Sequence, residues 1–168
     1  MSTKIMPSAI LFDWGDTLMV DTPGNIGKMC DWPVVTATEG AQEVLEFLSS
    51  HYLIYIATNA QESTAQDIEQ AFARVGLAKY LSGYFCYANL SLAKGSPDFY
   101  RKIAQQLQLA PSELVMIGDT LDKDIYPARE AGLQAVLLNS TQQSTDATVD
   151  SISQLNELKL KLDPCQNS

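Results

Sequence analysis

Four wholly apolar runs divide the chain, and each one stops at polar residues. The runs occupy residues 9–12, 53–57, 114–117 and 135–138. Runs of this length and composition are typical of central strands that are buried on both faces of a sheet. A shorter run at 83–86 predicts a fifth strand.

Segments in which apolar residues recur with helical spacing lie between these runs. They cover residues 40–50, 63–75, 97–107 and, more briefly, 124–132. Strands that alternate with helices imply right-handed crossovers and a parallel sheet that helices cover on both sides. The pattern therefore predicts an α/β protein: a three-layer α/β/α Rossmannoid fold with a mainly parallel five-stranded sheet.

We expect residues 1–168 to form a single domain, because this length suits one α/β core and is too short for two. The segment at about 18–39 is rich in Pro, Gly, Asp and Thr, and we expect an irregular flap there. The segment at about 141–168 is predicted to be a polar C-terminal tail, with a small helix at 152–162.

Polar side chains gather at the ends of the predicted strands. Asp13, Thr58 and Asp119 stand at three of these ends, and Asp124 comes five residues after Asp119. Ligands of parallel sheets bind beyond the carboxyl ends of the strands. Carboxylates brought together there repel one another unless a hard cation neutralises them, and Mg²⁺ suits an all-oxygen site. Lys94, just before a predicted helix, supplies a point charge for a phosphoryl group.

Composition excludes several classes of function. The net charge of -9 argues against a nucleic-acid groove and against binding to an anionic membrane. Three cysteines without a C-x-x-C pair, and a single histidine, do not make a zinc site and indicate free thiols in a reducing compartment. We find no signal-peptide core and no apolar stretch near the roughly 20 residues of a membrane span, so we expect a cytoplasmic protein.

Four short motifs occur in order along the chain. They read FDWGDTL at 12–18, IYIATN at 54–59, KGSPDFY at 94–100 and GDTLDKD at 118–124. The set resembles the haloacid dehalogenase (HAD) superfamily of aspartyl-nucleophile phosphotransferases. That family carries D-x-D-x-T, a Thr or Ser after a strand, a Lys often followed by P-x-P, and G-D-x-x-x-x-D. Each motif alone is weak, but four in this order and at these strand ends are specific.

The resemblance implies a HAD-like fold and a mechanism. Asp13 would attack phosphorus and form an aspartyl-phosphate. Thr58, Asn59 and Lys94 would bind the phosphoryl oxygens, and Lys94 would also offset the charge of Asp13.

The resemblance also implies a Mg²⁺ cofactor. Its ligands would be Asp13, the backbone carbonyl of Gly15, Asp119 and Asp124, with Asp124 orienting Lys94 or a metal-bound water.

Two features depart from the family pattern. Family phosphatases usually carry a general acid two residues after the nucleophile, where this chain has Gly15. Asp16 is one place further on, and we interpret it as a turn former. Second, the gaps at 18–39 and 58–94 are too short for a full cap domain. An open site suits a phosphorylated substrate as large as a protein or polymer end, or a partner subunit that supplies the lid.

The leading hypothesis is a Mg²⁺-dependent phosphatase that works through Asp13. Because Gly15 removes the usual acid, an alternative is a catalytically impaired HAD fold that serves as a binding module. A third is hydrolysis of a bond other than a phosphate ester, such as carbon–halogen, although that chemistry does not need the metal ligands. Without an acid, aryl and acyl phosphates are expected to be cleaved better than alkyl ones.

Overall fold

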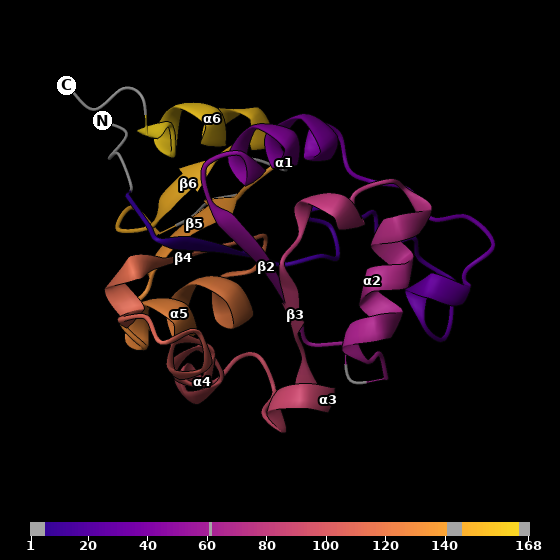
Figure 1. Ribbon diagram of the computed structural model, residues 1–168, viewed down its shortest axis with the longest axis horizontal. Helices are drawn as coiled ribbons and strands as arrows, with labels where there is room; N and C mark the ends of the chain where they lie inside the picture. The colour runs from indigo at the N-terminus through magenta and orange to yellow at the C-terminus, as the bar shows by residue number, and fades with distance from the viewer. Residues whose placement is uncertain (1–5, 61, 141–145, 165–168) are drawn as a thin grey trace.

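The centre of the molecule is a parallel sheet. The computed structural model describes residues 6–60, 62–140 and 146–164. Its strands follow the order β3-β2-β1-β4-β5-β6, and every neighbouring pair is parallel (Figure 1). The strands are β1 (Ala9–Phe12), β2 (Leu53–Ala57), β3 (Gly83–Phe85), β4 (Leu114–Gly118), β5 (Gln134–Leu138) and β6 (Asp150–Ile152).

Helices cover both faces of this sheet. They are α1 (Ala41–Ser49), α2 (Ala65–Arg74), α3 (Tyr87–Leu90), α4 (Pro97–Leu107), α5 (Tyr126–Glu130) and α6 (Leu158–Lys161). Alternate residues of a strand point to opposite faces. Ile10 and Phe12 therefore join the core with α1, α2 and α6, whereas Ala9 and Leu11 join the core with α3, α4 and α5. Figure 1 shows α1 and α6 opposite α4 and α5. The predicted three-layer α/β/α fold is confirmed.

Shorter turns connect these elements. The 3₁₀ helices are η1 (Met29–Asp31), η2 (Ala78–Tyr80), η3 (Pro111–Glu113) and η5 (Leu155–Glu157), and η4 (Leu121–Ile125) is a π-helical turn. Local sequence explains where α4 begins. Pro97 is its first residue, and the hydroxyl of Ser96 accepts a hydrogen bond from the N–H of Asp98 at 3.1 Å. This cap places Lys94 just outside a fixed helix end.

The prediction of five strands and a polar tail is wrong for residues 146–164. β6 pairs with β5 at the edge of the sheet, which makes six strands. Only Ile152 of its three residues is buried, so the strand is too short to show a period of two. The small helix expected at 152–162 exists as η5 and α6, but Leu155, Leu158 and Leu162 bury it in the core. The rest of the predicted tail lies outside the described residues.

A full cap domain is absent from the part of the chain that the structure describes, as the sequence predicts. Between β1 and α1 the chain forms the turn η1, two isolated β-bridges and irregular segments. Between β2 and Lys94 it forms α2, η2, β3 and α3. The site at the carboxyl edge of the sheet is therefore bordered by loops of the fold itself.

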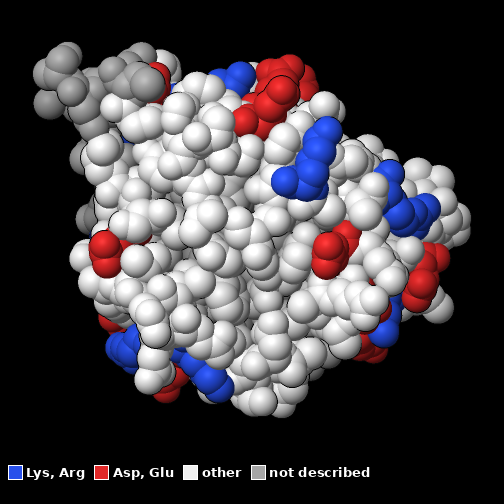
Figure 2. All heavy atoms as spheres, viewed as in Figure 1, with Lys and Arg blue, Asp and Glu red and all other residues white. Residues whose placement is uncertain are grey.

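The surface carries both signs of charge. On the face shown in Figure 2, lysines and arginines stand in small separate groups near aspartates and glutamates. Proteins that bind nucleic acids usually present a continuous basic stripe to the phosphate backbone. The face in Figure 2 has no such stripe. None of the described helices is long and apolar enough to cross a membrane.

Candidate active site

The topology of the sheet brings Asp13 and Asp119 together. β1 and β4 are neighbours, but β1 leads through α1 to β2 on one side, and β4 leads through α5 to β5 on the other. Such a reversal of direction is where ligands bind in open parallel sheets. The N–H of Asp13 donates to the carbonyl of Ile117 at 2.9 Å. Strand pairing itself therefore sets the two aspartates side by side.

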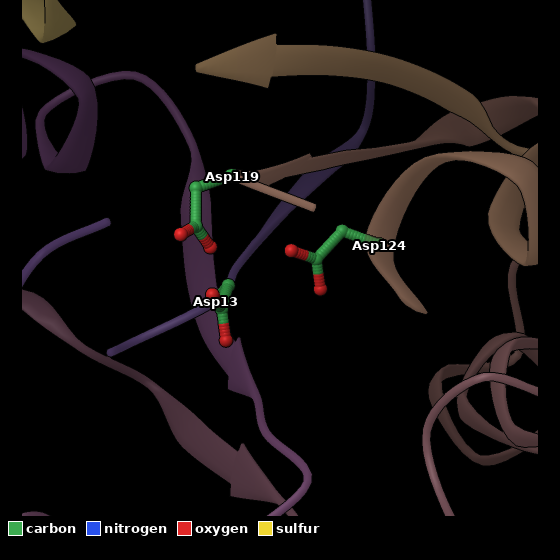
Figure 3. A group of neighbouring side chains, drawn as sticks. All are labelled: Asp13, Asp119 and Asp124. Atoms are coloured by element: carbon green, nitrogen blue, oxygen red, sulfur yellow. The ribbon is translucent and has the colours of Figure 1, made fainter. Parts of the chain in front are cut away.

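Three carboxylates converge at this point (Figure 3). Asp13 comes from the end of β1, Asp119 from the end of β4 and Asp124 from the turn that follows. One oxygen of each carboxylate lies within 4.8 Å of the others. Asp13 and Asp124 are buried and Asp119 is partly buried. Solvent does little to screen their mutual repulsion, so this arrangement needs positive charge.

Lys94 supplies part of that charge from the other side of β1. Its Nζ lies 2.7 Å from Oδ1 of Asp13 and 2.7 Å from Oδ1 of Asp124. It also donates to the carbonyl of Ala57, at the end of β2, at 3.2 Å. The lysine is only 6% exposed. Three carboxylates against one ammonium leave the cluster with a formal charge of -2.

Burial and charge act in opposite directions on this cluster. Desolvation raises the pKa of Asp13 to about 6, although the charge of Lys94 pulls it down. Desolvation, together with the charge of Asp13, raises the pKa of Asp124. Desolvation lowers the pKa of Lys94, but the charges of Asp13 and Asp124 together outweigh it, so the pKa of Lys94 is raised. The lysine therefore stays protonated at neutral pH, where Asp13 is mostly ionised.

The turn after β4 explains the glycine at position 118. Oδ2 of Asp124 accepts hydrogen bonds from the N–H and the hydroxyl of Thr120, at 3.1 and 3.0 Å. Its Oδ1 has Lys94 as an ion-pair partner but accepts no hydrogen bond of ordinary geometry from the described residues. A side chain at Gly118 would collide with this carboxylate. Glycine thus leaves the room that Asp124 needs to reach Lys94, in a π-helical turn of the kind often found at functional sites.

Thr58 and Asn59 follow β2, the strand beside β1. Thr58 is buried, and its hydroxyl oxygen accepts a hydrogen bond from the N–H of Ala60 at 3.1 Å. Its own proton remains available to a ligand. Oδ1 of Asn59 accepts from the N–H of Lys94 at 3.1 Å. The asparagine therefore fixes the backbone of Lys94, and only its amide N–H groups are left for a phosphoryl oxygen.

Thr17 is a site residue to which sequence reasoning gave no role. It is fully buried, and its hydroxyl lies 3.2 Å from Oδ2 of Asp13 and 3.5 Å from Oδ1 of Asp119. The hydroxyl of Thr38 donates to the Thr17 carbonyl at 2.7 Å, which ties the end of the flap to the site. The available signal was its place as the last residue of D-x-D-x-T.

A family model of haloacid dehalogenase-like hydrolases matches residues 33–132, more than half of the chain. The chain belongs to the haloacid dehalogenase-like hydrolases. The matched segment contains Thr58, Lys94, Asp119 and Asp124 but begins beyond Asp13. The place of Asp13 in the site therefore rests on the geometry described above.

One curated relative is the pyrimidine 5'-nucleotidase PynA of Streptococcus pneumoniae (strain ATCC BAA-255 / R6). It is 31% identical over 102 residues, which are 60% of this chain and 42% of the relative. The match thus spans about two fifths of the relative's length.

Solved structures share the fold at low sequence identity. An uncharacterized protein from Listeria monocytogenes serotype 4b superposes with a TM-score of 0.78 at 22% identity, over 90% of this chain and 94% of that one. The HAD-hydrolase YfnB from Bacillus subtilis, bound to magnesium, gives 0.76 at 14% identity, over 94% and 99%. A HAD phosphatase from Thermococcus onnurineus gives 0.74 at 18% identity, over 91% and 96%.

In this HAD-like chain, Asp16 does not take the place of the acid that is missing at Gly15. The backbone of Asp16 is left-handed, with φ at 57°. Its Oδ1 accepts a hydrogen bond from the N–H of Asp21 at 3.0 Å. Asp16 and Thr17 line a cavity of about 460 Å³, whereas Gly15 lines a different one. Asp16 therefore belongs to a turn and does not line the cavity beside Gly15.

The cavity beside Gly15 has a volume of about 510 Å³. Its walls come from the first motif, the flap and the segment after β2: Trp14, Gly15, Asp21, Gly27, Lys28, Met29, Trp32, Asn59, Ala60, Glu62 and Ser63. A volume of this size is within the range of pockets that hold small molecules. It adjoins the candidate phosphate-binding residue Asn59 and is partly apolar, with two tryptophans.

Side chains of α2 hold the flap wall of this cavity. The guanidinium of Arg74 donates to the carbonyls of Cys30, Trp32 and Pro33 at 3.1, 2.6 and 3.2 Å. Lys28 forms an ion pair with Asp67 of α2 at 2.9 Å. The part of the flap at residues 28–33 is therefore attached to α2 by hydrogen bonds and an ion pair.

Proposed function

We propose that this protein is a Mg²⁺-dependent phosphatase that works through an aspartyl-phosphate on Asp13. The observation that carries the proposal is the environment of the Asp13 carboxylate. Lys94 holds its Oδ1 at 2.7 Å, and the hydroxyl of Thr17 lies 3.2 Å from its Oδ2. A buried carboxylate held in one orientation at a ligand-binding edge is suited to nucleophilic attack.

The residues of the site divide the work. Asp13 attacks phosphorus, and the bond between phosphorus and the leaving oxygen breaks. The ammonium of Lys94 offsets the charge of Asp13 and of the phosphoryl oxygens. The hydroxyl of Thr58 and the amide of Asn59 bind phosphoryl oxygens, and water later cleaves the aspartyl-phosphate.

The donor set fits a hard divalent cation. It is all oxygen, it carries a formal charge of -2 even with Lys94 in place, and its carboxylates lie within 4.8 Å of one another. Asp13, Asp119 and the carbonyl of Gly15 would hold Mg²⁺, which would neutralise charge on the phosphoryl group. Asp124 acts mainly through Lys94, because its oxygens are occupied by that lysine and by Thr120.

Two alternatives are less well supported. Carbon–halogen hydrolysis also uses an aspartate nucleophile but gives no reason for a cluster of three carboxylates beside a lysine. A binding module without turnover is suggested only by Gly15. The nucleotidase PynA and the phosphatase from Thermococcus onnurineus favour phosphate monoesters as the substrate class.

The proposal is tested by a phosphatase screen over acyl, aryl and alkyl phosphates and a phosphopeptide, with Mg²⁺ or with chelator. We expect turnover that needs Mg²⁺ and that falls to background in Asp13→Asn, while circular dichroism shows that the variant remains folded. Phosphate binding without turnover of any substrate would support the binding module instead. Turnover that survives in Asp13→Asn would remove Asp13 from the mechanism.

A further inference from the structure

We propose that Asp21 supplies the general acid and base that the first motif lacks at Gly15. The inference rests on the proposed phosphatase function and assigns a catalytic residue within it. Asp21 lies outside the four motifs, six residues beyond Gly15 in sequence.

Asp21 lies next to the position where a side chain at Gly15 would begin. A Cβ built on Gly15 would lie 3.8 Å from Cβ of Asp21 and 3.9 Å from its Oδ2. Among the described residues, apart from the chain neighbours of Gly15, no other atom comes within 4 Å of that position. The carboxylate oxygens of an aspartate lie about 2.4 Å from their own Cβ, two bonds away. Asp21 therefore reaches the region that an aspartate at position 15 would occupy.

The turn between the two residues is built to hold Asp21 there. Asp16 adopts a left-handed conformation and accepts a hydrogen bond from the N–H of Asp21 at 3.0 Å. The N–H of Asp16 donates to the carbonyl of Met19 at 2.6 Å, which closes the loop. Gly15 and Asp16 thus act together, because Gly15 leaves space beside the turn and Asp16 positions Asp21 next to that space.

The side chain of Asp21 is accessible from the cavity beside Gly15. It is exposed, and its carboxylate makes no hydrogen bond or ion pair with any residue that the structure describes. It lines the 510 Å³ cavity together with Gly15 and Asn59. Asp13, Asp119 and Asp124, by contrast, are occupied within the buried cluster. A leaving group that lies in the cavity meets Asp21 and not the cluster.

Asp21 takes part in both steps of the reaction. In the first, Asp13 attacks phosphorus, the phosphorus–oxygen bond to the leaving group breaks, and the carboxylic acid of Asp21 gives its proton to the leaving oxygen. In the second, the Asp21 carboxylate takes a proton from the water that attacks the aspartyl-phosphate. The phosphorus–oxygen bond to Asp13 then breaks, releasing inorganic phosphate and restoring both residues.

The test compares Asp21→Asn with wild type on ethyl phosphate and acetyl phosphate in the presence of Mg²⁺. A positioned acid contributes roughly 10²–10⁴-fold when the leaving group is a poor one. We expect kcat/KM on ethyl phosphate to fall by about that factor, while kcat/KM on acetyl phosphate changes by less than about tenfold. Acid-quenched Asp21→Asn should also contain more phosphorylated protein than wild type, because water lacks its base.

Two further variants make the test specific. Glu62→Gln removes another carboxylate of the same cavity and should leave both rates within about twofold of wild type. The double variant Gly15→Asp, Asp21→Asn carries a carboxylate at position 15 in place of the one removed at position 21. It should recover at least a tenth of the lost ethyl phosphate activity. The backbone at Gly15 is not left-handed, and the nearest contacts of a Cβ there are ordinary ones.

The outcomes separate the inference from the function on which it rests. A wild type that hydrolyses no acetyl phosphate with Mg²⁺ overturns the proposed function and the inference with it. A wild type that hydrolyses acetyl phosphate through Asp13, but ethyl phosphate not at all or equally well in Asp21→Asn, overturns the inference alone. An equal loss of kcat/KM on both substrates would mean that Asp21 has a structural role, and it would also overturn the inference.

Discussion

The floor of the site and the wall beside it are held by different interactions. The floor consists of Asp13, Asp119, Asp124 and Lys94, which are buried or partly buried at the carboxyl edge of the sheet and interact through their charges. The wall consists of residues 14–33, a segment that is irregular apart from η1 and that contains both exposed residues, such as Asp21, and buried ones, such as Trp14. Side chains such as Arg74 bind wall carbonyls from outside. The floor therefore depends on the pairing of buried charges, whereas the wall depends on hydrogen bonds and an ion pair with α2.

This difference is informative about function. Buried groups that repel one another cost stability, and sites tolerate that cost where chemistry needs it. Among its described residues, the wall has no comparable cluster of buried carboxylates. Substrate choice and proton transfer are expected to lie in the wall, and nucleophilic attack in the floor.

The largest effect is expected from Lys94→Met. The variant leaves two carboxylates buried without their cation, and breaking a buried pair in this way costs about 3–5 kcal/mol of unfolding free energy. Because Asp13 and Asp124 have raised pKa values, the loss should shrink as pH falls and these carboxyls take up protons. Chemical unfolding at pH 8 and pH 5 measures the loss of unfolding free energy and its dependence on pH.

Lys161→Met is the matched control for that variant. Lys161 is also buried and paired with Asp150, at 2.5 Å, but it lies outside the site and the Asp150 side chain is 29% exposed. Water can solvate the remaining carboxylate of Asp150, so the loss of unfolding free energy should be smaller than in Lys94→Met. Phosphatase activity should be unchanged. Equal losses in both variants would contradict the special electrostatic demand of the floor.

Mg²⁺ should stabilise wild type but not Asp119→Ala. A ligand at about one hundred times its Kd adds about 2.7 kcal/mol to the unfolding free energy. The alanine variant lacks a ligand and one unit of negative charge. Melting curves over a Mg²⁺ titration measure the difference, and an identical response of the two proteins would place the metal elsewhere.

A smaller effect is expected from pH in the metal-free protein. The folded pKa of Asp13 is raised to about 6 from 3.8, so its protonated form is favoured by folding. The resulting stability is fully present below about pH 4 and is lost as pH rises through 6, by an amount on the order of 2 kcal/mol. Asp13→Asn should lack this dependence. Parallel stability curves for the two proteins between pH 4 and pH 7 would refute the raised pKa.

The smallest effect is expected from Arg74→Met in the wall. The variant removes the donor to three flap carbonyls, and we expect a loss of about 1–2 kcal/mol with a rise in KM for small substrates. Arg101→Met is the control, because among the described residues Arg101 pairs with Asp98 alone, in an exposed ion pair, and its loss should cost less than about 0.5 kcal/mol. An unchanged KM in Arg74→Met would mean that the flap does not shape the substrate pocket.

The sequence reveals the floor well and the wall poorly, for physical reasons. Asp13, Thr58 and Asp119 follow apolar runs, and parallel pairing brings such strand ends together whatever the loops do. The contacts of Arg74 with carbonyls more than 40 residues away leave no local pattern. Nor does the approach of Asp21 to Gly15, which depends on a left-handed turn at Asp16. β6 was missed because a three-residue edge strand has almost no hydrophobic period.

Direct detection of a phosphoryl group on Asp13 tests the central claim most sharply. Wild type is mixed with acetyl phosphate and Mg²⁺, quenched in acid within milliseconds and digested, and the modified peptide is located by mass spectrometry. The account predicts a single acid-stable, base-labile phosphoryl group on Asp13 that forms with Mg²⁺, is absent with chelator and is absent from Asp13→Asn. Turnover of acetyl phosphate without any phosphorylated Asp13, or with the phosphoryl group on another residue, would contradict it.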